Sequence, residues 1–121
     1  MSFSNISLGQ IGENFASDYL LSKDFSIVER NFRCRSGEID IVAEKNKKIY
    51  FIEVKTKVGI EKGFPYEAIN YYKKMHMKRV INYYLLKNKI KDCKLSVGAL
   101  SVILNDDHSL RKITFYEDMP L

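Results

Sequence analysis

Apolar and polar side chains alternate along two neighbouring stretches of the chain, residues 37–44 and 49–55. A period of two is typical of β-strands that turn one face toward a core. The four residues between the stretches are long enough for a tight turn, with Asn46 and Lys47 as its two loop residues. The pattern therefore predicts an antiparallel hairpin with one apolar face and one charged face.

The predicted turn also determines which side chains face one another. Counted from a Lys45–Lys48 pair, the ladder places the carboxylate of Asp40 opposite that of Glu53 on the charged face. The other expected pairs are Glu38–Lys55 on the same face, and Ile39–Val54 and Ile41–Ile52 on the apolar face. A slip of one residue would move every side chain to the other face.

Two opposed carboxylates are an unfavourable choice for a purely structural sheet, because like charges on directly paired residues destabilise the pair. Hard carboxylate oxygens are, however, the ligands that Mg²⁺ prefers, and a nearby lysine can steady a water molecule or the charge that develops on a phosphodiester. Asp40, Glu53 and Lys55 supply these groups. The hairpin alone fits two interpretations equally well, a metal-dependent site or the solvated charged face of an antiparallel sheet.

The rest of the chain predicts two helices and three further strands. Ser7 and Gln10 form a capping box that begins a helix ending near residue 22. A second helix begins near Pro65 and ends near residue 88, after a loop at residues 58–64. Strands are expected at residues 25–32, 95–104 and 111–116. The order α-β-β-β-α-β-β predicts a single α/β domain over residues 1–121, a mixed sheet flanked by helices.

Charge favours a polyanionic partner. The net charge is +5, and residues 71–94 hold eight basic residues against the single acid Asp92, with Arg30, Arg33 and Arg35 as a second basic cluster. Lysines release counterions from phosphates, although a solvated helix face gives the same pattern. No apolar run is long enough for a bilayer span and no signal-peptide pattern occurs, so we expect a cytoplasmic protein without membrane contact.

Several common site types find no support in the sequence. The two cysteines lack paired spacing, the two histidines lack metal-ligand spacing, and no glycine-rich phosphate loop is present. Disulfide frameworks, zinc sites and nucleotide-dependent chemistry are therefore not expected.

Four segments of the chain form a recognisable set of motifs. They are Gly9-x-x-Gly12-Glu13, Glu29-Arg30-Asn31-Phe32-Arg33-Cys34-Arg35-x-Gly37-Glu38-Ile39-Asp40, Phe51-Ile52-Glu53-Val54-Lys55-Thr56-Lys57 and Gly63-Phe64-Pro65-x-Glu67-Ala68. Together, across roughly residues 7–88, they resemble the YraN-like proteins of bacteria. That family is similar to the restriction-endonuclease-like PD-(D/E)XK nucleases, and most similar among them to archaeal Holliday junction resolvases. The resemblance implies a restriction-endonuclease-like core.

The resemblance also implies roles for single residues. Asp40 matches the motif aspartate, Glu53 and Lys55 match the E-x-K pattern, and Glu13 matches an acidic residue of the first helix. Asp40, Glu53 and the Val54 carbonyl would bind Mg²⁺ or Mn²⁺, and Glu13 would reach the metal directly or through water. Lys55 would orient the attacking water. Partial burial would lower its pKa enough for proton transfer.

Two departures from the family pattern accompany these matches. Lys73 falls on a helix lysine of the family, but Lys74 replaces the neighbouring glutamine. Further along, residues 96–99 read Ser-Val-Gly-Ala where relatives carry Arg-Phe-Asp-Val, so an arginine and an aspartate are missing.

From the sequence we expect a metal-dependent endonuclease that acts on nucleic acid, with DNA favoured and branched DNA as a candidate substrate. Rival interpretations are a non-catalytic nucleic-acid-binding module and a protein-interaction domain. A resolvase needs two active sites on one junction, so a homodimer is compatible with this function. The expected nucleic-acid contacts are Arg33, Arg35, Lys57, Lys73, Lys74, Lys78 and Arg79.

Overall fold

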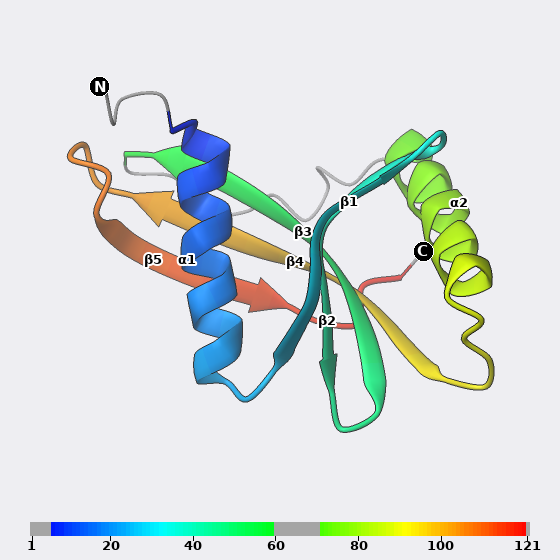
Figure 1. The fold of residues 1–121 in the computed structure, drawn as a ribbon. Coiled ribbons are helices and arrows are strands. Elements are labelled where there is room, and N and C mark those ends of the chain that lie inside the picture. The colour runs from blue at the N-terminus through cyan, green and yellow to red at the C-terminus, as the bar shows by residue number, and fades with distance from the viewer. Residues whose placement is uncertain (1–5, 60–70, 121) are drawn as a thin grey trace.

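The computed structural model describes residues 6–59 and 71–120, with only the backbone described at residues 71–74. A five-stranded mixed sheet carries two helices, which confirms the expected α/β class (Figure 1). The elements are α1 (Leu8–Ser22), β1 (Ser26–Cys34), β2 (Gly37–Lys45), β3 (Lys48–Val58), α2 (Tyr71–Lys87), β4 (Lys94–Leu104) and β5 (Leu110–Tyr116). The strands lie in the order β1-β2-β3-β4-β5, with β3 and β4 parallel and the other neighbours antiparallel.

The core has two parts, one on each face of the sheet. Phe51 of β3 packs in a cluster with Val80 and other residues of α2, whereas Ile52 packs in a second cluster with Leu20 of α1. Neighbouring residues of a strand point to opposite faces, so α1 and α2 cover opposite faces (Figure 1). The expectation that the hairpin has a single apolar face is therefore wrong, since both of its faces contribute to a core.

Helix α1 begins as the capping box predicts. The Ser7 hydroxyl accepts a hydrogen bond from the Gln10 amide at 3.1 Å. The helix lies so close to β3 that a Cβ on Gly12 would overlap the Thr56 hydroxyl oxygen. Glu13, the next residue, is thereby held over the sheet. The start predicted for the second helix near Pro65 and most of the predicted loop at residues 58–64 lie outside the described residues.

The hairpin forms with the predicted register near its turn. Asn46 and Lys47 both have positive φ, 52° and 63°, as a type I′ turn requires, and Lys45 pairs with Lys48. Among the residues that the structure describes, the β2–β3 ladder ends at the Ile41–Ile52 pair. The predicted ladder pairs beyond it are therefore not formed: Asp40–Glu53, Ile39–Val54 and Glu38–Lys55.

Beyond Ile41 and Ile52 the two strands separate. There β2 continues along β1 as far as the Cys34–Gly37 pair, while β3 continues along β4 as far as Val58–Leu104. The strands diverge to follow these different partners, and this divergence leaves an opening between Asp40 on one strand and Val54 on the other.

Strand β1 reverses its facing next to this opening. Asn31 has a φ of 54°, a left-handed conformation that interrupts the alternation of side chains along a strand. Its neighbours accordingly face opposite ways: Arg30 contacts Glu13 of α1, and Phe32 packs in the α2 cluster. On β2, Ile39 joins the α2 cluster and Ile41 the α1 cluster, so the expectation that these two share a face is wrong.

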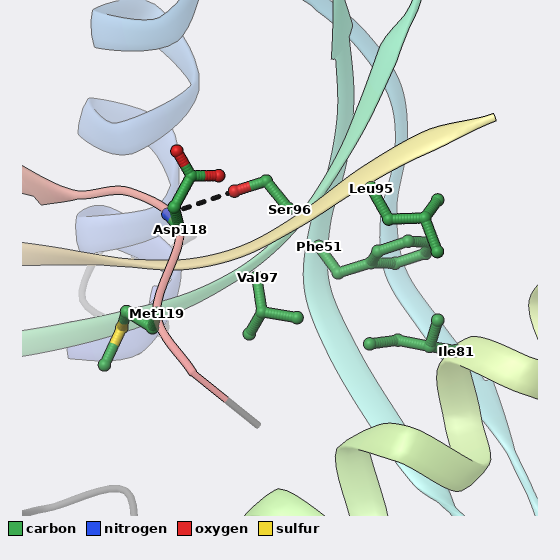
Figure 2. Close-up of a pocket in the computed structure, with 7 residues that line it drawn as sticks. All are labelled: Phe51, Ile81, Leu95, Ser96, Val97, Asp118 and Met119. Carbon is green, nitrogen blue, oxygen red and sulfur yellow. Dashed lines mark hydrogen bonds between the residues drawn. The ribbon is translucent and has the colours of Figure 1, made fainter.

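The segment after β5 closes the α2 side of the sheet (Figure 2). The Met119 amide donates to the Val97 carbonyl at 2.7 Å, and the Asp118 amide donates to the Ser96 hydroxyl at 3.1 Å. Asp118 also forms an ion pair of 2.9 Å with Lys48, the first residue of β3. These contacts surround a mostly apolar pocket of about 310 Å³. Neither helix, over its described part, has the length and apolar character needed to cross a lipid bilayer.

Candidate active site

Asp40 lies where β2 separates from β3. Its carboxylate there accepts a hydrogen bond from a β3 amide that no longer pairs with the β2 backbone. Its Oδ2 accepts a hydrogen bond of 2.8 Å from the Val54 amide. The amide and carbonyl of one residue point to the same side of an extended strand. The Val54 carbonyl therefore also faces the opening between the strands, near the half-buried Asp40 side chain.

The surroundings of Asp40 are unfavourable for its negative charge. Burial is the largest cause that raises the pKa of this carboxyl, to about 6, and the hydrogen bond from Val54 opposes the rise. The negative charges of Glu53, Glu13 and Glu38 raise it further, in that order. Three other carboxylates are thus close enough to act on Asp40, and they come from α1, β2 and β3.

Glu13 approaches this site from α1. Its Oε1 lies 3.6 Å from Nη2 of Arg30, and its side chain is only 16% exposed. The close packing of Gly12 on Thr56 sets the height of this turn above the sheet. Glu13 is therefore a poorly hydrated carboxylate with one cationic partner, on the side of the sheet that α1 covers.

Glu53 is half-buried and lies on the side of the sheet that α2 covers. It lines a pocket of about 250 Å³ together with Glu38, His76 and neighbouring residues of β2 and α2. Sequence reasoning gave His76 no functional role, because no metal-ligand spacing surrounds it. Its nearness to Glu53 depends on how α2 docks on the sheet, which the local sequence does not encode.

Lys55 follows Glu53 by two residues on β3, where its ladder partner is Ser101 of β4. The side chain is exposed, so the partial burial expected for it is wrong. It does not pair with Glu38 across the hairpin either. Glu38 instead forms a 2.9 Å ion pair with Arg33 of β1. Lys55 is left at the rim of the opening, within reach of solvent.

The expected nucleic-acid contacts lie on several elements. Arg33, which is 75% exposed, and Arg35 are at the β1–β2 end of the sheet, and Lys57 is half-buried on β3. Lys78 and Arg79 are exposed on α2, which packs on β1 and β2. Lys73 and Lys74 belong to the first turn of α2, but their side chains lie outside the described residues.

The donor atoms at the opening are all oxygens: the carboxylates of Asp40 and Glu53 and the Val54 carbonyl. Within residues 6–59 and 71–120, no three His, Cys, Asp or Glu side chains are grouped closely enough to hold a metal ion. Mg²⁺ is usually bound by one or two carboxylates, with water and substrate phosphates completing its shell. Two carboxylates and a carbonyl fit such a partly open site.

Arg30 and Asn31 were not assigned to the site from the sequence. Arg30 belongs to the basic cluster and to a segment of the family resemblance, but neither gives it a place at the site, and regular strand alternation would put it on the same face as Phe32. The left-handed Asn31 turns it toward Glu13 instead. Asparagine tolerates this conformation better than most residues, but that tendency alone does not locate such a residue inside a strand.

Comparison with known proteins gives a consistent family. Residues 12–104 match the uncharacterised protein family UPF0102. A UPF0102 protein of Caldicellulosiruptor bescii is 36% identical over 112 residues, covering 92% of this chain and 94% of the relative. One from Clostridium botulinum is 41% identical over 106 residues, covering 87% and 86%. The matched region contains Glu13, Asp40, Glu53 and Lys55. The chain therefore belongs to the UPF0102 family, the YraN-like proteins that its sequence motifs resemble.

Proposed function

We propose that the protein is a Mg²⁺- or Mn²⁺-dependent endonuclease that hydrolyses phosphodiester bonds in nucleic acid. The observation that carries the proposal is the half-buried Asp40 carboxyl, whose pKa is raised to about 6 by burial and by the charges of Glu53 and Glu13. Such a cluster is unfavourable without a cation, and strongly perturbed groups of this kind gather at functional sites. A bound divalent cation would remove the repulsion.

Each residue has a distinct role in this proposal. Asp40, Glu53 and the Val54 carbonyl would hold the cation, and Glu13 would act on it through water. The cation, when bound, polarises the phosphate and lowers the pKa of a bound water. Lys55 lies at the exposed rim, where its ammonium group contacts the attacking water or the charge that develops on the phosphate. The Val54 amide orients the Asp40 carboxylate.

The fold supports the same conclusion by analogy. We infer a restriction-endonuclease-like core, because the mixed sheet bears a helix on each face and its β2–β3 pair opens next to the acidic residues. One fold serves many functions, so the function follows from the site residues that this core positions. The exposed cations Arg33, Arg35, Lys78 and Arg79 suit phosphate contacts, and DNA, including branched DNA bound by a homodimer, is the substrate class we propose.

The test is a panel of substrates incubated with Mn²⁺ or Mg²⁺: four-way junctions, flaps, linear duplex, single-stranded DNA and RNA. We expect binding that weakens steeply with salt and cleavage of at least one structured DNA. Lys55→Ala should lose cleavage and keep binding, because the lysine acts mainly on the transition state. Arg111→Gln, on the far edge strand β5, is the matched control and should cut normally.

Two outcomes would redirect the assignment. Binding without cleavage on every substrate would favour a non-catalytic nucleic-acid-binding module. Absence of both binding and cleavage, at low salt and with either metal, would favour a protein-interaction domain.

A further inference from the structure

A second polar hollow lies beside the candidate site, on the side of the sheet that α1 covers. It has a volume of about 470 Å³ and is formed by the first turn of α1 and the middle of β1. Glu13 lines this hollow, and its charge also raises the pKa of Asp40. A group bound here would therefore stand next to the carboxylate cluster.

The β1 wall of the hollow carries two guanidinium groups, from Arg30 and Arg33. Nη2 of Arg30 forms an ion pair with Oε1 of Glu13 at 3.6 Å. Among the described residues, the buried Nε of Arg30 has no hydrogen-bond partner. Arg33 is paired with Glu38 through its own Nε at 2.9 Å, which leaves its two terminal nitrogens for another ligand. Guanidinium forks of this kind match the geometry of phosphate oxygens.

The opposite wall is the beginning of α1, and it adds to the positive potential. No acidic residue occurs in the first turn, so nothing there offsets the positive end of the helix dipole. Ser7 caps the Gln10 amide and leaves the earlier amides to other partners. Among the residues that the structure describes, a Cβ on Gly9 would meet only the Ser7 hydroxyl, at 4.0 Å, so this turn can be approached closely.

The hollow exists because of the left-handed residue in β1. Asn31, with a φ of 54°, turns Arg30 toward α1 and itself lines the hollow. An ordinary strand conformation would place Arg30 on the same face as Phe32, in the α2 core. The unusual backbone thus has a definite result, a guanidinium group placed between the helix start and the acidic site.

We propose that this hollow binds a phosphate of the nucleic-acid strand adjacent to the phosphate that is cleaved. The inference rests on the proposed function and deepens it, because it assigns a second subsite that fixes the register of the strand. Glu13 takes part in both sites: its ion pair orients Arg30 toward the bound phosphate, and its charge acts on Asp40. Arg30 is in this scheme a positioning residue that does not touch the scissile phosphate.

The test measures binding without metal, so that it does not depend on cleavage. Single uncharged methylphosphonate linkages are moved along a DNA strand, and affinity is measured by fluorescence anisotropy. For the wild-type protein one linkage should weaken binding several-fold. In Arg30→Gln that linkage should lose its effect. The negative slope of log K (the association constant) against log salt should become shallower by roughly 0.7–0.9, the value for one phosphate contact.

Arg111→Gln is the control, since it removes an exposed guanidinium from β5 and leaves the hollow intact. It should keep the wild-type sensitivity at that linkage. An Arg30→Gln variant that keeps the full sensitivity profile, while circular dichroism shows it folded, would overturn the inference and leave the nuclease proposal standing.

A second measurement separates this inference from the proposed function. Inorganic phosphate is titrated into ¹⁵N-labelled protein, and the amide signals of Gly9 and Asn31 are followed. Shifts that saturate in the wild type and are lost in Arg30→Gln would support the site even if no nucleic acid is cleaved. An absence of shifts at these amides, together with no sensitive linkage in DNA, would overturn it.

Discussion

Asp40 is subject to opposing influences that together define its chemistry. The Val54 amide stabilises its charged form, while burial and three neighbouring carboxylates favour the neutral form and raise its pKa to about 6. The ordinary value of an aspartate is 3.8. The folded protein therefore holds a proton on Asp40 at pH values where the unfolded chain has already released it.

This difference gives a pH-dependent stability with a defined sign. Between about pH 4 and pH 6 the folded state binds the additional proton, so the free energy of unfolding should fall as the pH rises through this window. Above pH 6 the full penalty remains. Asp40→Asn, which stays neutral and keeps an acceptor for the Val54 amide, should be more stable than wild type at pH 8 by on the order of 1–2 kcal/mol, allowing for solvent screening.

The measurement is urea denaturation in EDTA at pH 4.5 and pH 8. The advantage of Asp40→Asn should be largest at pH 8 and clearly smaller at pH 4.5, where about a third of it remains. Asp106→Asn, an exposed turn substitution, is the matched control and should show no such trend. An advantage that is the same at both pH values would mean that the Asp40 charge does not destabilise the fold.

At the level of residues, the sequence predicts that Asp40 and Glu53 are neighbours, but it does not predict the contact that positions Asp40. Counting the register brought them together, and the two charges do interact. The ladder nevertheless stops one pair earlier, and the Asp40 side chain bonds the Val54 amide instead. The role of Arg30 was not predictable, because it depends on the single left-handed residue Asn31.

The hairpin is the element that the sequence predicts best, because both of its determinants are local. Alternation gives the strands, and the two-residue turn fixes the Lys45–Lys48 pair. Helix α1 shows the opposite case. The apolar residue Leu8 is 36% exposed, whereas the small residues Gly12 and Ala16 are buried. Small side chains let the helix lie closer to the sheet, which a hydrophobicity pattern does not reveal.

The close approach of α1 predicts an unusual effect of an alanine. Gly12→Ala would normally favour a helix by about 1 kcal/mol, but here its Cβ would overlap the Thr56 hydroxyl. We expect Gly12→Ala to lower the stability by about 2–3 kcal/mol, as overpacking does. Gly9→Ala in the same helix, where space is open, should be neutral or stabilising. Thermal unfolding of both variants checks this, and equal melting temperatures would contradict the packing described.

The hairpin turn gives a prediction of the other sign. Lys47 has a φ of 63°, a conformation that costs a residue with a Cβ on the order of 1 kcal/mol. Lys47→Gly should therefore raise the free energy of unfolding by roughly 0.5–1 kcal/mol. Lys112→Gly, on exposed strand β5, should lower it by a similar amount. Destabilisation by both substitutions, measured in urea, would argue against a type I′ turn.

For the whole molecule, metal binding should couple to stability. A cation that relieves the repulsion among Asp40, Glu53 and Glu13 binds the folded state, and at 100 times its Kd it would contribute about 2.7 kcal/mol. Mg²⁺ or Mn²⁺ should therefore raise the melting temperature relative to EDTA. The increase should disappear in Asp40→Asn. An unchanged increase in that variant would show that the ion binds elsewhere.

The arrangement of the whole molecule was predictable only in outline. Element order and sheet class follow from local patterns, but the docking of α2, which brings His76 beside Glu53, depends on long-range packing. The contacts of Asp118 and Met119 likewise join residues far apart in the chain. The docking of α2 shapes the pocket that Glu53 lines, whereas the contacts of Asp118 and Met119 belong to the apolar pocket beside Ser96 and Val97. No local sequence pattern predicts either arrangement.

If the cluster around Asp40 performs phosphodiester hydrolysis, cleavage must depend on its carboxylates. Single-turnover cleavage of an end-labelled four-way junction with Mn²⁺ tests this, with wild-type protein and Glu53→Gln compared at concentrations where both bind the DNA fully. We expect site-defined cleavage by the wild type and a rate at least about 100-fold lower in Glu53→Gln. Equal cleavage by the two proteins would contradict it, because the chemistry would then come from somewhere other than this site.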